Sequence, residues 1–175
     1  MQLLAFQLAS EVSCNELANT LQVSVNTIEK NIDLLEKTFV IFRLQSFSRN
    51  IRNELKKSRK IYFYDNGLRN SIISNFNNLY LRNDTGQLWE NYLIAERIKK
   101  IAVQNLFCNQ YFWRTTEYQE VDYIEEHSGK LFAYEFKWNE RKKARLSKTF
   151  TNAYPETDFI VINRENYTDF IGFDK

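Results

Sequence analysis

The sequence is poor in the residues that build the commonest nucleotide and metal sites. Its 175 residues include four glycines, one proline, two cysteines and one histidine. No glycine belongs to a GxxxxGK[ST] or GxGxxG run, so the chain carries no dinucleotide fingerprint and no ATPase motif. The one histidine, His127, lies in an expected hairpin turn, which leaves no basis for a histidine triad or a Cys/His zinc site. Any hydrolytic chemistry must therefore rest on carboxylates and lysines, with or without a metal ion.

Long apolar segments are missing as well. No run of about 18 apolar residues occurs and no signal-peptide pattern follows Met1, so the sequence predicts a soluble cytoplasmic protein without membrane contact. Cys14 and Cys108 lie far apart without CxxC spacing, and the simplest interpretation is two free thiols in a reducing compartment.

The chain does have enough apolar surface for a core. Hydrophobic residues make up 43% and aromatic residues 15% of the sequence, which favours a globular fold over a disordered tail. The length of 175 residues suits one ordinary domain or two small ones. The net charge of +2 neither demands nor excludes a nucleic-acid partner, so the placement of the charges has to decide.

The first part of the chain has the period of short helices. An apolar-rich helix is expected over 2–9, and Ser13 followed by Glu16 forms a capping-box pattern before a second helix. After the turn "QVS", Ser24 is placed to cap a third helix that extends to about Thr38. Two short helices joined by a tight turn are the helix-turn-helix pattern, which serves either DNA binding or protein interaction.

The period then changes to that of strands. "FVIFRLQ" and "KIYFYD" are expected to form the two-stranded wing of a winged helix, which completes a first module over 1–73. The following "DNG" at 65–67 is a turn signal. The basic loop between the strands either contacts DNA phosphates or is a solvated loop kept soluble by its charge. Against the single acid Glu54, this loop contains Arg49, Arg52, Lys56, Lys57, Arg59 and Lys60.

An Asn-rich connection at 74–86 leads to a second module over 86–175. A three-stranded meander followed by a crossover helix and a parallel strand is an α/β sandwich, with a right-handed crossover. The expected fold class is thus α/β, or α+β for the chain as a whole. The elements of this module are a helix at 86–102, strands at 106–114, 120–126 and 130–138, a basic helix at about 141–153 and a strand at 158–163.

Charged residues lie inside two of these strands. Alternation along "KLFAYEFKW" places Glu135 and Lys137 on one face and the aromatic side chains on the other, which is the core face. In a simple hairpin register, Asp122 of the preceding strand lies near both of them. On that preceding strand, alternation groups Glu120, Asp122 and Ile124 opposite Val121 and Tyr123.

Such a group of charges suits a divalent metal ion. Converging carboxylates repel each other unless a proton or cation lies between them, and Mg²⁺ prefers carboxylate and water oxygens, so Asp122 and Glu135 are candidate ligands. Lys137 would then face a phosphate oxygen or water, an arrangement that suits phosphodiester hydrolysis. Glu90, at the edge of the apolar face of the 86–102 helix, is placed to supply a further acid. The structural alternative is a buried ion network in which Lys137 and Arg114 satisfy the two carboxylates.

These features together resemble a known superfamily. Asp122, a gap, and Glu135-x-Lys137 on a meander, with an acid in the preceding helix, resemble the PD-(D/E)xK restriction-endonuclease-like superfamily. More specifically, "KIYFYDNGLRN", "GQLWENYL", "YFWRTTEYQEVDYI" and "YEFKW" resemble the domain of unknown function that ends many prokaryotic AAA-type ATPases, including its winged-helix start. The resemblance covers the chain from about Leu3 to Ile162.

The resemblance implies a nuclease-like site at Glu90, Asp122, Glu135 and Lys137, with Mg²⁺ at Asp122 and Glu135. It also implies an ATPase module, in the same chain or another, as a partner. Because the activity of that family is unsettled, two functions stay open. One is a metal-dependent deoxyribonuclease positioned on DNA by the winged helix, and the other is an inert DNA-binding or protein-interaction module that partners an ATPase.

DNA contacts, if the chain makes them, are expected in two basic stretches. The first is the loop between the wing strands, and the second is "RKKARLSK", which follows the strand of Glu135 and would lie beside a substrate backbone. A solvated helix face is the alternative for the second stretch. The residues expected to contact DNA are Arg49, Arg52, Lys56, Lys57, Lys142 and Lys143.

Overall fold

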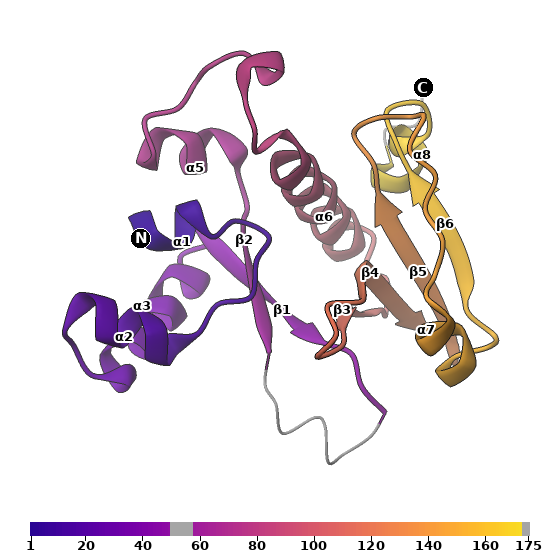
Figure 1. The fold of residues 1–175 in the computed structure, drawn as a ribbon, viewed down its shortest axis with the longest axis horizontal. Coiled ribbons are helices and arrows are strands. Elements are labelled where there is room, and N and C mark those ends of the chain that lie inside the picture. Colours follow the sequence, from indigo (N-terminus) through magenta and orange to yellow (C-terminus); the bar gives the residue numbers. More distant parts are fainter. Residues whose placement is uncertain (50–57, 173–175) are drawn as a thin grey trace.

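The computed structural model describes residues 1–49 and 58–172. They form a mixed α/β fold, α+β in its overall arrangement, around one six-stranded sheet with the order β2-β1-β3-β4-β5-β6 (Figure 1). Neighbouring strands are antiparallel except for β1 with β3 and β5 with β6, which are parallel. The strands are β1 (Ile41–Ser46), β2 (Arg59–Phe63), β3 (Asn109–Arg114), β4 (Glu120–His127), β5 (Lys130–Phe136) and β6 (Asp158–Ile162).

The helices fall into groups along the sheet. In Figure 1, α1, α2, α3 and α5 lie on the side of β1 and β2, whereas α6 lies between that half and the strands β3 to β6. The order helix, three strands, helix, strand that the sequence predicts for the second half is confirmed. The helices are α1 (Gln2–Phe6), α2 (Cys14–Leu21), α3 (Val25–Lys37), α5 (Asn66–Ile72), α6 (Thr85–Val103), α7 (Lys148–Ala153) and α8 (Tyr167–Ile171), with a 3₁₀ turn, η1, at Leu79–Leu81.

The two helices of the predicted helix-turn-helix pair begin at the serines that the sequence indicates. The Ser13 hydroxyl accepts the amide of Glu16 at 3.3 Å, and the Ser24 hydroxyl accepts the amide of Thr27 at 3.1 Å. Each bond satisfies one of the amides that a helix start leaves without an intrahelical partner. Between the helices, Gln22 adopts the left-handed conformation with φ of 54°, which ends α2 in a tight turn.

The two strands expected as a wing do not stand apart from the rest of the fold. β1 and β2 pair antiparallel from Ile41 with Phe63 to Gln45 with Arg59, as a wing requires. At its far end, however, β1 also pairs parallel to β3, through Gln45 and Ser46. The sheet therefore continues from the first part of the chain into the second.

β2 is an edge strand, and its outer edge is covered by two other segments. The Asn91 side chain on α6 accepts the Phe63 amide at 2.8 Å and donates to the Phe63 carbonyl at 2.9 Å, as a neighbouring strand would do. Further along, the Val12 amide donates to the Arg59 carbonyl at 3.0 Å. An edge whose amides and carbonyls are paired offers no template for pairing with another chain.

A buried ion pair holds α6 to the sheet. The Arg97 guanidinium donates to both carboxylate oxygens of Glu125 on β4, at 2.6 and 2.8 Å, and to the Phe170 carbonyl of α8 at 2.8 Å. Glu125 is only 1% exposed, so the two parallel bonds are needed to compensate the cost of removing its charge from water. One side chain thus fixes a helix, a strand and the last helix relative to each other.

Two sequence-based expectations about local structure are wrong. "DNG" at 65–67 is not a free turn, because the Asp65 carboxylate accepts the amide of Leu68 at 2.7 Å and caps α5. Asp is as well suited to a helix start as to a turn. The basic helix expected at 141–153 is confined to Lys148–Ala153, where Ser147 caps it. Like charges at 141–145 disfavour a helical turn there, because Arg145 would then lie beside Lys142 and Arg141, three and four residues earlier.

The core lies on both faces of the sheet. One cluster joins the first helices, β1, β2 and α6 to Tyr123, Tyr134 and Phe136. The other cluster is smaller and surrounds Phe150 of α7, with Trp113 and Ile124 among its members. No helix within 1–49 and 58–172 is both long and apolar enough to cross a membrane. Cys14 and Cys108 are free thiols, as the sequence predicts.

We expect the covered edge of β2 to make a large contribution to stability. Asn91→Leu removes both bonds to Phe63 and leaves a buried amide and carbonyl unpaired, so the free energy of unfolding should fall by about 2 to 4 kcal/mol in urea denaturation. Asn19→Leu, at an exposed position of α2, is the control and should change it by less than about 0.5 kcal/mol. Equal effects of the two substitutions would contradict the role of Asn91.

Candidate functional site

Four charged side chains from one helix and two strands lie together where β4 and β5 separate. Glu90 comes from α6, Asp122 from β4 and Glu135 from β5, and Lys137 directly follows β5. The charge of Asp122 raises the pKa of Glu90, Glu135 and Lys137, so all four groups are within electrostatic reach. The structure thus brings together the four residues that the sequence selects.

The strands separate because Asp122 takes over a bond of the ladder. The register of β4 with β5 runs from His127 with Lys130 to Tyr123 with Tyr134. At the next position the Asp122 carboxylate accepts the Phe136 amide at 2.8 Å. A side chain therefore replaces a backbone carbonyl at this point, and its carboxylate is held between the two strands.

β4 has a bulge at the same place, and it overturns one expectation from alternation. Two residues separate Ile124 from Val121 on β4 where a single residue separates their β3 partners, Tyr111 and Trp113. Val121 and Ile124 accordingly join the same core cluster, whereas Tyr123 joins the other. The predicted grouping of Ile124 opposite Val121 is wrong because an extra residue in a strand resets its alternation.

Glu135 and Lys137 form a direct ion pair. The Lys137 ammonium lies 2.7 Å from Glu135 Oε2, and the side chains of Lys137 and Glu135 are 27% and 12% exposed. Both face the same side of the strand, as alternation predicts. The lysine reaches solvent, so it can move to an incoming anion without leaving a buried cavity behind.

The pKa values of three carboxyl groups in the cluster, those of Glu90, Asp122 and Glu135, are raised. Burial, together with the charge of Asp122, raises the pKa of Glu135 from 4.5 to about 7 against the opposing hydrogen bond of Lys137. Burial also raises the pKa of Glu90 to about 7, although Lys60 acts in the other direction. Burial raises the pKa of Asp122 despite the bond from the Phe136 amide. With pKa values of about 7, Glu90 and Glu135 exchange protons readily at neutral pH.

Three further residues of the cluster were missed from the sequence as members of the site. The Lys60 ammonium is paired with Glu120 and lies 3.2 Å from Glu90 Oε1, and the Tyr62 hydroxyl donates to the same oxygen at 2.7 Å. Lys60 is only 2% exposed, although its position among basic residues favours a solvated loop. The signal that could have found them is that Lys60 and Tyr62 alternate onto one face of the strand "KIYFYD".

Arg114 does not play the part that the structural alternative gives it. Its guanidinium lies 3.7 Å from Glu120 and 3.8 Å from Glu11, so it neutralises the far side of the cluster. The Glu135 and Lys137 pair of that alternative is present. Lysines therefore lie beside the carboxylates on two sides, Lys60 within the protein and Lys137 near the surface.

The donor set fits a single hard cation held by two carboxylates. Asp122 and Glu135 are oxygen donors of the kind that Mg²⁺ prefers, and their mutual repulsion is the force that a cation would relieve. Among the described residues, no group of three or more His, Cys, Asp or Glu side chains is placed to hold a metal ion. Water and a substrate oxygen would complete the coordination of an ion at these two residues.

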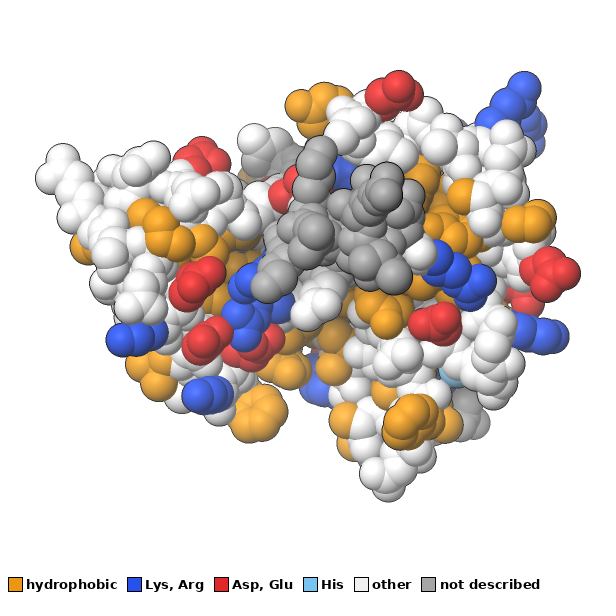
Figure 2. Space-filling view, turned by 90° about the horizontal axis from the view of Figure 1, so that it is seen from below, with side chains coloured by type: hydrophobic (Ala, Val, Ile, Leu, Met, Phe, Trp, Pro, Cys, Tyr) orange, Lys and Arg blue, Asp and Glu red, His pale blue; other side chains and the backbone are white. Residues whose placement is uncertain are grey.

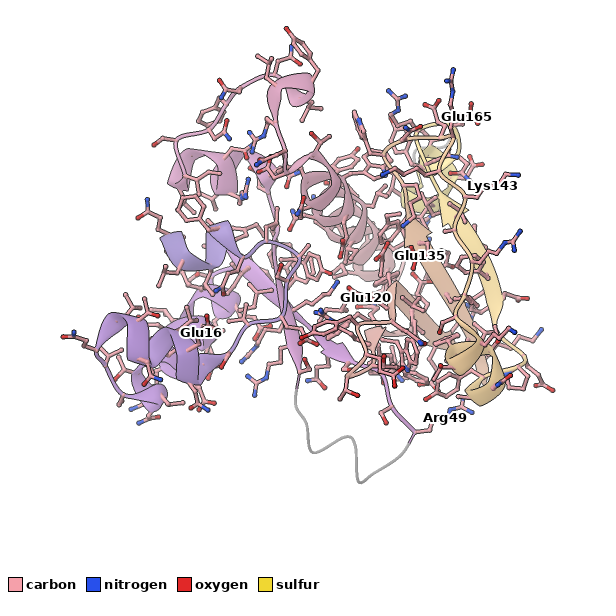
Figure 3. The ribbon with its side chains drawn as sticks, in the orientation of Figure 1. Glu16, Arg49, Glu120, Glu135, Lys143 and Glu165 are labelled. Atoms are coloured by element: carbon pink, nitrogen blue, oxygen red, sulfur yellow. The ribbon has the colours of Figure 1, made fainter. Side chains whose placement is uncertain are left out.

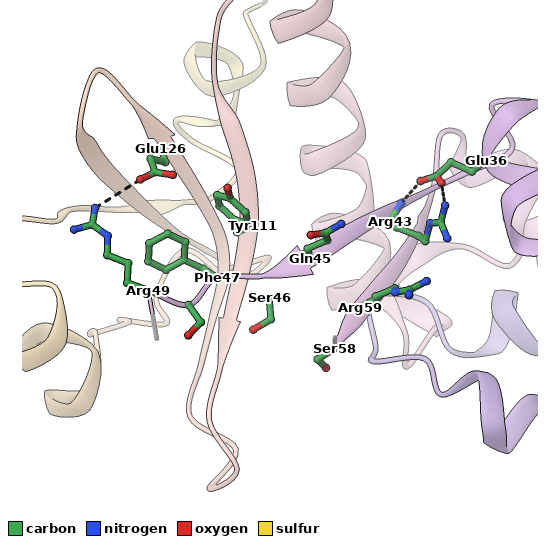
Figure 4. A pocket seen from close by; sticks show the side chains of 11 residues that line it. Glu36, Arg43, Gln45, Ser46, Phe47, Arg49, Ser58, Arg59, Tyr111 and Glu126 are labelled. Atoms are coloured by element: carbon green, nitrogen blue, oxygen red, sulfur yellow. Dashed lines mark hydrogen bonds and ion pairs between the residues drawn. The ribbon is translucent and has the colours of Figure 1, made fainter. Parts of the chain in front are cut away.

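The expected DNA-contacting residues lie at separate places. Arg49 lines a pocket of about 790 Å³ at the end of β1 and lies 3.6 Å from Glu126 (Figure 4). Lys142 and Lys143 are exposed on the connection before α7, and Figure 3 shows Lys143 far from Arg49. Arg52, Lys56 and Lys57 lie outside the described residues. Other residues that line the pocket are Glu36, Arg43, Gln45, Ser46, Phe47, Ser48, Ser58, Arg59, Tyr111 and Glu126.

Charge on one face of the molecule is mixed among the residues that the structure describes. Figure 2 shows acidic and basic side chains interspersed on one face of the molecule, which agrees with the net charge of +2. Arg43, in the pocket, is itself paired with Asp33 and Glu36. Among the described residues of this face, contact with a polyanion would therefore depend on individual cations.

The fold and the site define a mixed α/β protein with a buried cluster of carboxylates and lysines at a strand fork. Residues 85–172 match the model of a family described as "Domain of unknown function (DUF4143)", and the chain belongs to this family. Residues 1–79 match a second model, described as "Domain of unknown function (DUF8612)". Lys60 and Tyr62 fall in the segment 1–79, and the rest of the cluster falls in the segment 85–172.

The chain is also similar to two mycobacterial proteins. It is 30% identical over 124 residues to "Uncharacterized protein Mb2031c" of Mycobacterium bovis and to "Uncharacterized protein Rv2008c" of Mycobacterium tuberculosis. The match covers 70% of this chain and 27% of each relative, so the chain spans about a quarter of their length. No solved structure matches the chain.

The raised carboxyl pKa values predict a pH-dependent stability. Glu90 and Glu135 hold their protons more tightly in the folded chain than in the unfolded one, so the free energy of unfolding should fall as the pH rises from about 4.5 to about 7. Glu135→Gln removes one of these groups and should reduce that fall by about 1 to 3 kcal/mol. Urea denaturation at a series of pH values measures this dependence of the free energy of unfolding on pH.

The control for this experiment is Glu117→Gln, which removes an exposed carboxylate from the turn before β4. It should leave the dependence on pH unchanged. If the free energy of unfolding changes equally between pH 4.5 and 7 in Glu135→Gln and in Glu117→Gln, the pKa of Glu135 is not raised in the folded chain.

Proposed function

We propose that the chain is a nuclease-like module of the PD-(D/E)xK type that hydrolyses phosphodiester bonds with the help of a divalent cation. The observation that carries this proposal is the strand fork. Asp122 and Glu135 meet there from adjacent strands, with Lys137 at 2.7 Å from Glu135. Metal-assisted attack on a phosphate requires oxygen donors for the cation and a positive group near the phosphate. The two carboxylates and the ammonium of this partly exposed fork are groups of these kinds.

Each residue has a role that follows from its surroundings. Asp122 and Glu135 would hold the cation, which lowers the pKa of water and neutralises phosphate charge when it is bound. Lys137, 27% exposed, exchanges Glu135 for a phosphate oxygen and orients it. Glu90, with a pKa raised to about 7 by burial, accepts or holds a proton inside the cluster.

DNA is the substrate that the proposal favours, delivered in a larger assembly. Lys142 and Lys143 are exposed and follow the strand of Glu135 in the chain, and Arg49 is 58% exposed in its side chain. These cations suit contacts to a phosphate backbone. Because the mycobacterial relatives are far longer than the chain, we propose that it acts as the C-terminal module of an ATPase, the architecture that its sequence resembles.

A second candidate function is a non-catalytic module that binds DNA or a protein partner of such an ATPase. One observation favours it: the carboxylates already have cationic partners, since Lys60 contacts Glu90 and Glu120, and Lys137 contacts Glu135. A charge cluster that is internally neutralised can stabilise a fold without catalysing a reaction. The two functions differ in whether the protein cleaves DNA, so a cleavage assay decides between them.

Cleavage of plasmid DNA in Mg²⁺ or Mn²⁺ tests the proposed activity. Asp122→Asn, Glu135→Gln and Lys137→Met should each reduce the rate of nicking by about 100-fold or more, because each removes a group that acts on the reacting phosphate or its cation. The matched controls are Glu117→Gln and Lys130→Met, at exposed positions before β4 and at the start of β5.

Controls that nick at the wild-type rate would show that these losses are local. Nicking that survives when Asp122→Asn, Glu135→Gln and Lys137→Met are combined in one variant would exclude this site as its source. A wild-type protein that binds duplex DNA but does not nick it in either metal would favour the non-catalytic function instead.

The DNA contacts can be tested apart from cleavage. The double substitution Lys142→Glu, Lys143→Glu should weaken binding to a duplex and lower the slope of log K against log salt by about 0.9 for each phosphate that the protein no longer neutralises. Lys99→Glu with Lys130→Glu removes the same number of exposed lysines elsewhere and should leave the slope closer to that of the wild type. The measurement is fluorescence anisotropy at several salt concentrations. An equal reduction of the slope in both double variants would argue against DNA binding by Lys142 and Lys143.

A further inference from the structure

The cation at the centre of the cluster is a side chain of the protein. The Lys60 ammonium is paired with Glu120, lies 3.2 Å from Glu90 Oε1, and lies 5.4 Å from the centre of the Phe112 ring. Two carboxylates and an aromatic face thus enclose it. Lys60 is 2% exposed, and although burial alone would lower its pKa, Glu90 and Glu120 raise it, so it stays charged.

The two lysines of the cluster differ in whether the ammonium group can move away from its carboxylate partners. Lys137 is 27% exposed and can move into solvent, which frees Glu135 for another partner. Lys60 has no such path, because its stem lies inside the sheet and its ammonium would have to be stripped of both carboxylates. The place between Glu90 and Glu120 is therefore permanently filled, whereas the place between Asp122 and Glu135 is not.

We propose that the Lys60 ammonium is a built-in cation that takes the place between Glu90 and Glu120, so that the cluster binds one divalent cation, at Asp122 and Glu135, and not two. The inference rests on the proposed function for the site at Asp122 and Glu135. Sites with two metal ions use both to neutralise charge around the phosphate. Here an ammonium from β2 takes the position that a second ion would need between Glu90 and Glu120, and the Arg114 guanidinium lies 3.7 Å from Glu120.

This arrangement also makes the site composite. Lys60 belongs to the segment that matches one family model, at residues 1–79, and Asp122 and Glu135 belong to the segment at 85–172 that matches the other. Lys60 is a positioning residue in this scheme, because it holds Glu90 and Glu120 and does not touch the substrate. A second segment that lacked β2 would contain the same carboxylates without their internal cation.

Calorimetric titration of the full chain with Mn²⁺ tests the proposal. The wild type should bind one equivalent. Lys60→Met frees Glu90 and Glu120 for a cation and should bind two equivalents, whereas Lys60→Arg keeps the charge and should bind one. Two equivalents in the wild type, or the same number in the wild type and in folded Lys60→Met, would overturn the proposal.

The same titration separates this inference from the proposed function. No binding to the wild type but one equivalent in Lys60→Met would support the built-in cation and refute a cation site at Asp122 and Glu135. No binding to either protein would overturn both ideas. One equivalent in each would overturn only the role of Lys60.

A second variant keeps the test decisive if Lys60→Met does not fold. Glu120→Gln leaves Lys60 in place and removes one of its two carboxylates. Asp122→Asn should weaken Mn²⁺ binding at least tenfold. Glu120→Gln should still bind one equivalent with a smaller loss of affinity, because Glu120 acts on Asp122 and Glu135 through its charge and is not a ligand. A loss of Mn²⁺ affinity in Glu120→Gln as large as the loss in Asp122→Asn would show that Glu120 is a ligand and would refute the proposal.

Discussion

The pairing of buried charge at Lys60 is the constraint on which the rest of the structure depends. An ammonium that is 2% exposed is tolerated only if carboxylates surround it, and here they come from α6 and β4. In the sheet, β1 and β3 lie between β2 and β4, and β1 pairs with β3 only at its end, through Gln45 and Ser46. The ion pair of Lys60 with Glu120 therefore links two strands that are not neighbours in the sheet. The first and second parts of the chain meet at this point.

A second consequence is electrostatic. Asp122 lies in the field of Lys60 and Lys137 and in contact with the Phe136 amide, yet burial still raises its pKa, and its charge in turn raises that of Glu135. Burial is the larger cause of the raised pKa of Glu135, and the charge of Asp122 adds to it although Lys137 is paired with Glu135. A cation between Asp122 and Glu135 would relieve this repulsion, which is the basis of the proposed function, whereas a structural ion network would leave it in place.

Much of the local structure followed from patterns in the sequence. Ser13 and Ser24 marked the starts of α2 and α3, and the alternation of charged and aromatic residues on β5 was confirmed, because short-range geometry alone decides such features. The failures have local causes too. Asp65 suits a helix cap as well as a turn, and the bulge in β4 placed Val121 and Ile124 in one core cluster, which no period of two predicts.

The sequence by itself determined the fold class, the order of elements in the second half and the candidate set of Glu90, Asp122, Glu135 and Lys137. Only the tertiary structure decided that Lys60 is a buried partner of Glu90 and Glu120 rather than part of a solvated basic loop. It also decided that Arg114 pairs with Glu120 and Glu11. The reason is physical: periodicity reports which face a side chain takes, whereas the partner of a buried charge depends on contacts between residues that are distant in the chain.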